Sequence, residues 1–250
     1  MTGFLRQLFS DKITASMLLI SSLIIGICAL APSLFVIIVL NKYLASGVSE
    51  TLISLSAGAI LLLLFEFAFR QNRSKMIQSF NKKLFSPLLQ SLSKKVKQTE
   101  ITGEQFKSLE RAGTVLKGAT GSSLTAWLLD WPFVLLFLVI LLYINWTAAL
   151  ITSIFMLIMI LLTTQRSNLR LQLDSTANLE IFLTGLLTVT IISVGATQII
   201  AGTLDIGLLI GSNILAARAL QGTSKYAKAI EFLKQRDQAV GEIINYVKGK

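Results

Sequence analysis

Three ionisable side chains lie inside long apolar stretches of this sequence and are its first candidates for chemistry. They are Glu66, Asp130 and Arg218. A charged group is costly inside a membrane, so an ionisable residue in such a stretch often marks an ion pathway, a substrate pathway or a buried ion pair. We therefore treat all three as candidate intramembrane polar residues.

Each of the three also has a structural interpretation, which the sequence favours. Glu66 precedes Arg70 by four residues, the spacing at which opposite charges pair on one face of a helix and anchor it at the membrane interface. Asp130 directly precedes a Trp-Pro pair, as expected for an acidic cap at a helix N-terminus. Arg218 can reach the lipid headgroups along its aliphatic stem, and pairing with an acid is the alternative.

The residue types give little support to catalysis. The sequence has no histidine and one cysteine, Cys28, which excludes histidine-based metal or acid–base sites and an intramolecular disulfide. The glycine-rich segment 118–123 lacks the lysine and the spacing of a phosphate-binding loop. We predict that this chain is not an enzyme, holds no cofactor or metal, and relies on a separate chain for any ATP hydrolysis.

Composition indicates that these residues belong to an integral membrane protein. Of the 250 residues, 53% are hydrophobic and 14% are charged, and the mean hydropathy is +0.70. A bilayer core about 30 Å thick needs roughly 20 helical residues, and six apolar runs approach that length. The predicted spans are 13–40, 51–69, 124–144, 146–162, 181–200 and 206–220. The prediction is an all-α membrane protein with one domain over 1–250, and Pro32 is expected to kink its first span.

Basic residues predict how these spans are oriented, because loops rich in lysine and arginine stay in the cytoplasm. The segments 1–12, 70–126, 164–180 and 218–250 hold 22 of the 23 basic residues, and only Lys42 falls in a loop assigned outside. We expect a bacterial cytoplasmic (inner) membrane protein with both termini in the cytoplasm. The net charge of +10 then reflects topology and contact with anionic lipid, and no nucleic-acid partner is expected.

Two helical regions, 70–123 and 221–250, are expected in the cytoplasm. In the first, an apolar stripe runs from Ile77 to Leu92, and Pro87 is expected to kink or interrupt that helix. A turn then leads into a second helix that returns to the membrane.

The tail region carries a heptad-like apolar stripe in which Asp237 fills one place. Its candidate packing residues are Ile230, Leu233 and Ile244. In the sixth span, Gly207 and Gly211 form a GxxxG step that favours close packing against another helix.

Several stretches resemble the permease domain of type I secretion ABC exporters. They are LDWPF at 129–133, GTLDIGLLIG at 202–211 with AARAL at 216–220, FEF at 65–67 followed by Arg70, and GEQF at 103–106. The resemblance implies six spans that extend into the cytoplasm as long helices. It also implies a coupling turn that docks an ATPase, with Gly103, Glu104, Phe106 and Glu110 as candidate contact residues.

The sequence departs from that family in two places. Only residues 163–180 separate the fourth and fifth spans, which is too short for the family's second coupling excursion. The nucleotide-binding domain that would follow the sixth span is also missing from the 250 residues.

These departures favour an accessory or scaffold component of an export assembly. One alternative is the permease subunit of a type I protein or peptide secretion transporter powered by a separate ATPase, and another is a passive channel or small-solute transporter. The expected partners are membrane lipid and either further copies of the chain, as a dimer or larger oligomer, or other export proteins.

Overall fold

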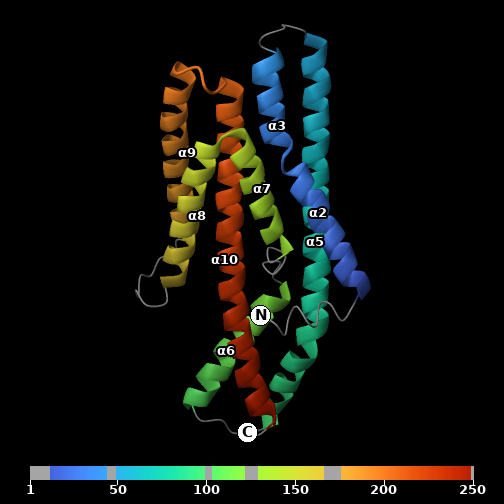
Figure 1. The fold of residues 1–250 in the computed structure, drawn as a ribbon. Helices are drawn as coiled ribbons and strands as arrows, with labels where there is room; N and C mark the ends of the chain where they lie inside the picture. Colours follow the sequence, from blue (N-terminus) through green and yellow to red (C-terminus); the bar gives the residue numbers. More distant parts are fainter. Residues whose placement is uncertain (1–11, 44–48, 99–102, 122–128, 166–175, 249–250) are drawn as a thin grey trace. The chain divides into compact units, whose positions relative to one another are not determined.

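The computed structural model describes residues 12–43, 49–98, 103–121, 129–165 and 176–248, and these residues form helices without any strand (Figure 1). The helices are α2 (Lys12–Cys28), α3 (Ala31–Ile38) with the π-helix Val39–Tyr43, α5 (Ser49–Gln98), α6 (Gly103–Gly121), α7 (Trp131–Ile144), α8 (Trp146–Gln165), α9 (Thr176–Ile200) and α10 (Ile206–Lys248). The all-α prediction is therefore confirmed for the described residues.

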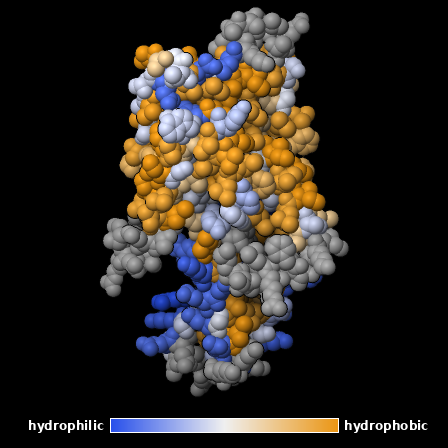
Figure 2. All heavy atoms as spheres, viewed as in Figure 1, coloured by the Kyte–Doolittle hydropathy of each residue, from blue (hydrophilic) through white to orange (hydrophobic). Residues whose placement is uncertain are grey.

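The chain divides into two compact units. The apolar unit comprises residues 20–70 and 129–227, and the basic unit comprises residues 1–19, 71–128 and 228–250. Among the described residues, every large hydrophobic side chain that is exposed belongs to the apolar unit, except Met17, Leu19 and Phe106. Figure 2 shows how densely hydrophobic residues cover this apolar surface. A surface of this kind is suited to lipid rather than to water.

Four of the described helices are long and apolar enough to cross a membrane. They are Thr14–Asn41, Leu52–Val96, Trp146–Thr163 and Asn178–Ile200, and they correspond to the first, second, fourth and fifth predicted spans. The third span is described only as α7, a 14-residue apolar helix, and residues 124–128 lie outside the described part. The sixth predicted span is the beginning of α10, which is not among the four. A six-span bundle therefore remains a prediction.

The two internal prolines have different consequences. Pro32 lies in the first turn of α3, where a missing N–H costs no hydrogen bond, and the first span is divided there into α2 and α3. The Ser33 hydroxyl donates to the Leu30 carbonyl across this break, at 2.8 Å. The expected kink is present at this proline. Pro87 lies within α5, which continues from Ser49 to Gln98, so the alternative in which Pro87 interrupts the helix is wrong.

Asn145 organises the tight connection between α7 and α8. Its side-chain oxygen accepts hydrogen bonds from the backbone N–H groups of Thr147 and Ala148, each at 3.2 Å, and thereby caps the N-terminus of α8. Its amide nitrogen also donates to Gln198 of α9 at 3.4 Å. The core of the apolar unit lies around these helices and the first part of α10, and includes Leu141, Met159, Leu187, Ile191, Leu215 and Leu220.

Gly207 and Gly211 lie on the face of α10 that packs against the end of the first span. A Cβ atom on Gly207 would lie 3.1 Å from the Ile37 carbonyl, and one on Gly211 would lie 3.2 Å from the Ser33 carbonyl. The Gly207 N–H also donates to the Asn41 side chain at 3.2 Å. The two glycines thus let the backbones of α3 and α10 approach closely.

Replacement of Gly211 by alanine should lower the free energy of unfolding by about 1–2 kcal/mol, because the added methyl group meets a backbone carbonyl that cannot move alone. Gly185→Ala in α9 is the matched control. Its Cβ would meet nothing within 4 Å, so helix propensity should make it neutral or stabilising by up to about 1 kcal/mol. Thermal unfolding of the purified proteins in detergent measures both, and equal midpoints for the two variants would contradict this packing.

The basic unit has its own core, formed by the second part of α5, by α6 and by the end of α10. The buried members are Phe85, Leu92, Leu109, Ala112, Leu116, Ala239 and Ile243. The two helices expected over 70–123 are present as α5 and α6, whereas the turn expected between them falls on residues 99–102, outside the described part.

The buried stripe of the tail differs from the predicted one by about one residue. The buried positions are Ala229, Leu233, Arg236, Ala239 and Ile243, whereas Ile230 and Ile244 are only half-buried. Asp237, expected to fill a place in the stripe, has a side chain that is 46% exposed.

Arg236 takes the buried place next to Asp237. Its guanidinium lies over the Phe85 ring, 5.5 Å from the centroid, and donates two hydrogen bonds to Asp237. Partial burial raises the pKa of Asp237, but the hydrogen bonds and charge of Arg236 outweigh it, so that pKa lies below its usual value.

Candidate functional site

Glu66 is the buried acid of the apolar unit. It lies on α5 at the position where the helix leaves its most apolar stretch, and the residue is 8% exposed. Arg70 follows one helical turn later, so both side chains lie on the same face. Arg70 donates to Glu66 Oε1 from Nε at 2.9 Å and from Nη2 at 2.8 Å. The pair expected from the four-residue spacing is therefore formed.

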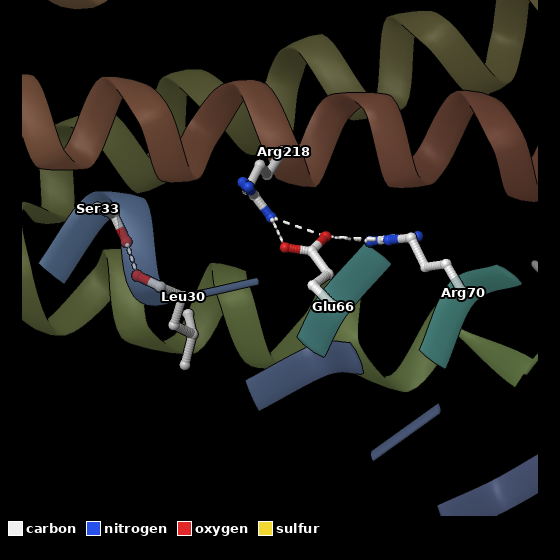
Figure 3. A network of polar contacts seen from close by, with 5 residues as sticks. All are labelled: Leu30, Ser33, Glu66, Arg70 and Arg218. Carbon is white, nitrogen blue, oxygen red and sulfur yellow. Dashed lines mark hydrogen bonds and ion pairs between the residues drawn. The ribbon is translucent and has the colours of Figure 1, made fainter. Parts of the chain in front are cut away.

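Arg218 of α10 completes the cluster from a distant part of the sequence. Its Nη1 atom lies 3.4 Å from both carboxylate oxygens of Glu66. Figure 3 shows Arg70 and Arg218 approaching this carboxylate from two sides, with the Ser33–Leu30 hydrogen bond at the start of α3 nearby. Of the two interpretations of Arg218, the structure shows the pair with an acid.

Two cations share one anion in this cluster. Arg70 and Arg218 both contact the Glu66 carboxylate, and arginine stays protonated in proteins. Within the described part of the chain, Arg218 hydrogen-bonds only through Nη1, and its side chain is 25% exposed. Arg218 therefore keeps further N–H donors beside the carboxylate that it shares with Arg70.

Asp130 has a different role from the one expected. It occupies the residue before α7 and is buried, but its side chain makes no capping hydrogen bond. Its backbone carbonyl accepts from the N–H groups of Phe133 and Val134, at 3.0 and 3.4 Å. The Asp-Trp-Pro sequence thus starts the helix through the backbone and the proline, without the expected carboxylate cap.

Glu180 makes a polar contact that the sequence analysis does not predict. It lies on α9, one residue before the fifth predicted span, and its Oε2 atom accepts a 2.7 Å hydrogen bond from Ser224 of α10. Ser224 is fully buried. Forty-four residues separate the two, so no local spacing pairs them, and the only signal was an acid at the edge of an apolar run.

The candidate coupling residues Gly103, Glu104, Phe106 and Glu110 lie in the first two turns of α6, and all four are exposed. Phe106 is 45% exposed, whereas Leu109, one turn later on the same helix, is buried in the core of the basic unit. Outside α2, Phe106 is the only exposed large hydrophobic residue in the described part of this unit.

No group of three or more histidine, cysteine, aspartate or glutamate side chains that could hold a metal ion occurs among the described residues. Comparison with known proteins does not identify the chain, because no family model and no curated protein matches it. Functional inference therefore rests on the geometry of the two sites, the Glu66 cluster and the start of α6.

Proposed function

We propose that this chain is an exporter-like membrane subunit that acts as an accessory or scaffold component of an export assembly in the bacterial cytoplasmic membrane. In this proposal, the apolar unit anchors the chain in the bilayer. The basic unit lies in the cytoplasm and docks a partner protein through the first turns of α6.

The exposure of Phe106 is the observation that carries this proposal. A single exposed apolar residue is ordinary on a protein surface, but Phe106 lies in the segment that resembles a coupling turn. The burial of Leu109 fixes the orientation of this part of α6. Exposed charges of both signs lie within five residues of Phe106 along α6, at Glu104, Lys107, Glu110 and Arg111. An aromatic residue surrounded by polar groups is a frequent centre of protein–protein interfaces.

The second candidate function is a permease subunit driven by a separate ATPase, and the Glu66 cluster favours it. An ion pair that links two helices within an apolar unit has the character of an intramembrane functional site. Both functions place a partner at the start of α6. They differ in whether that partner hydrolyses ATP.

Site-specific photo-cross-linking tests the proposed docking surface. A photoreactive amino acid is placed at position 106 in membranes of the native host, and the adducts are identified by mass spectrometry. Thr114 is the matched control position because it is exposed on the same helix, two turns farther along. We expect one dominant protein adduct from position 106, with at least about a tenfold lower yield from 114.

The identity of the adduct distinguishes the two functions. A membrane or export protein without ATPase activity supports the scaffold, whereas an ATPase supports the driven permease. Equal, diffuse labelling at both positions would show that the start of α6 has no specific partner, and would refute this docking surface.

A further inference from the structure

An apolar cavity of about 350 Å³ lies between α3 and α5 within the apolar unit. Its lining residues come from one face of each helix, and only one of them is polar. They are Pro32, Phe35 and Val36 of α3, and Ser56, Ala59, Ile60 and Leu63 of α5. A cavity lined in this way favours an apolar ligand, since water would find few hydrogen-bond partners in it.

The cavity and the Glu66 cluster lie along the same face of α5. The lining positions Ser56, Ala59 and Leu63 recur at intervals of three and four residues, and Glu66 and Arg70 continue that series. Leu63 and Glu66 are separated by a rise of about 4.5 Å along the helix. On α3, the lining residue Pro32 adjoins Ser33, which Figure 3 shows near the cluster. An apolar cavity and a charged cluster thus follow each other along one helix face.

The spare donors of Arg218 select the kind of ligand. Arg218 uses only Nη1 for its hydrogen bonds to Glu66 in the described part of the chain. A phosphate group would accept hydrogen bonds from the remaining guanidinium N–H groups of Arg218. The same group would give Arg218 an anionic partner of its own, in place of a carboxylate that it shares with Arg70, in a medium where a charge is costly.

We propose that this face binds one anionic membrane phospholipid. An acyl chain occupies the cavity between α3 and α5, and the headgroup phosphate pairs with Arg218 beside Arg70. Basic sites between membrane helices on the cytoplasmic side are suited to anionic headgroups, and Glu66 holds the two arginines together at that position. The proposal does not depend on a protein partner at α6, so either proposal can fail without the other.

Retention of lipid by the full chain tests this site. The protein is reconstituted into vesicles of equal parts phosphatidylglycerol and phosphatidylcholine and extracted into mild detergent. The two retained lipids are then quantified per protein by mass spectrometry. We expect phosphatidylglycerol to be enriched about fivefold, the ratio that one basic residue near an anionic headgroup provides.

Two pairs of variants separate the charge from the cavity. Arg218→Gln should reduce the enrichment to less than about twofold, whereas Lys117→Gln, which removes an exposed charge on α6, should leave it unchanged. Ala59→Phe fills the cavity and should lower the retained amount of both lipids. Ala57→Phe adds the same ring at an exposed position of α5 that does not line the cavity, and should retain lipid as the wild type does.

Several results would overturn the proposal. Equal retention of the two lipids by the wild type would remove the role of the charge, and unchanged retention by Ala59→Phe would remove the role of the cavity. If inorganic phosphate alone raises the unfolding temperature without added lipid, the cluster binds a free anion instead. Should Arg218→Gln fail to fold, Arg218→Lys replaces it. The lysine variant keeps the charge, so loss of enrichment in that variant would contradict the charge argument.

Discussion

Replacement of Glu66 by glutamine should lower the free energy of unfolding by about 3 kcal/mol, because it leaves two arginines without their carboxylate. The Glu66 side chain is only 11% exposed and accepts hydrogen bonds from both arginines. Removal of one member of a buried ion pair typically costs about 3–5 kcal/mol. The two arginine side chains are partly exposed and can turn toward headgroups or water, so we expect the lower end of that range.

A double-mutant cycle measures this coupling. Arg218→Gln should cost only about 1–2 kcal/mol, because Glu66 Oε1 keeps both of its hydrogen bonds from Arg70. The double variant Glu66→Gln with Arg218→Gln should lose less free energy of unfolding than the two single variants lose in sum. In the double variant, neither charge of the removed contact is left without its partner. Glu242→Gln, at an exposed position of α10, is the control and should change stability by less than about 0.5 kcal/mol.

Unfolding is followed by denaturant titration of the purified protein in mixed micelles, with helix content as the signal. If Glu66→Gln and Glu242→Gln are indistinguishable, the Glu66 cluster contributes nothing to stability and the pairing described above is absent in solution. Strict additivity of the Glu66 and Arg218 variants would likewise exclude their contact.

The Glu66 cluster shows which part of a site can be predicted from sequence. The pairing of Glu66 with Arg70 follows from local helix geometry, since a four-residue step brings both side chains to one face. The contact with Arg218 spans 152 positions and depends on how α5 and α10 pack. Sequence alone could list pairing with an acid as one alternative for Arg218, but it could not choose that alternative or name Glu66.

The membrane spans show a similar limit. Long apolar runs are a local property, and four of the six predicted spans correspond to helices that are long and apolar enough to cross a bilayer. The third and sixth predicted spans depend on features that hydropathy does not resolve. The described helix α7 has 14 residues, and α10 continues without a break from its apolar beginning into a charged tail.

The buried stripe of the tail differs from the predicted one because the prediction depends on side-chain size and hydrophobicity. The structure buries Ala229 and Ala239, whose small side chains allow close helix packing, and Arg236, whose stem and guanidinium cover Phe85. Ile230 and Ile244, which the sequence favours, are only half-buried beside these smaller or charged neighbours. The correct stripe still passes through Leu233, which both descriptions share.

Adjacent isoleucines near the end of α10 provide the sharpest test of this register. Ile243 is fully buried in the core of the basic unit, whereas Ile244 is half-buried. Consecutive residues point about 100° apart around a helix. Ile243→Asp should therefore cost about 3–5 kcal/mol, because it places a carboxylate among Phe85, Leu109 and Leu116. Ile244→Asp should cost less than about 1.5 kcal/mol, since its side chain can reach water.

Hydrogen exchange and limited proteolysis of the full chain in detergent measure the two substitutions side by side. For Ile243→Asp, we expect loss of amide protection over the end of α10 and over α6, because both helices share that core. For Ile244→Asp, protection should stay close to the wild type. Since the two variants have the same composition and charge, a difference between them can arise only from the face on which each residue lies. Greater disruption by Ile244→Asp would restore the stripe predicted from the sequence and refute the packing of α10 in the basic unit.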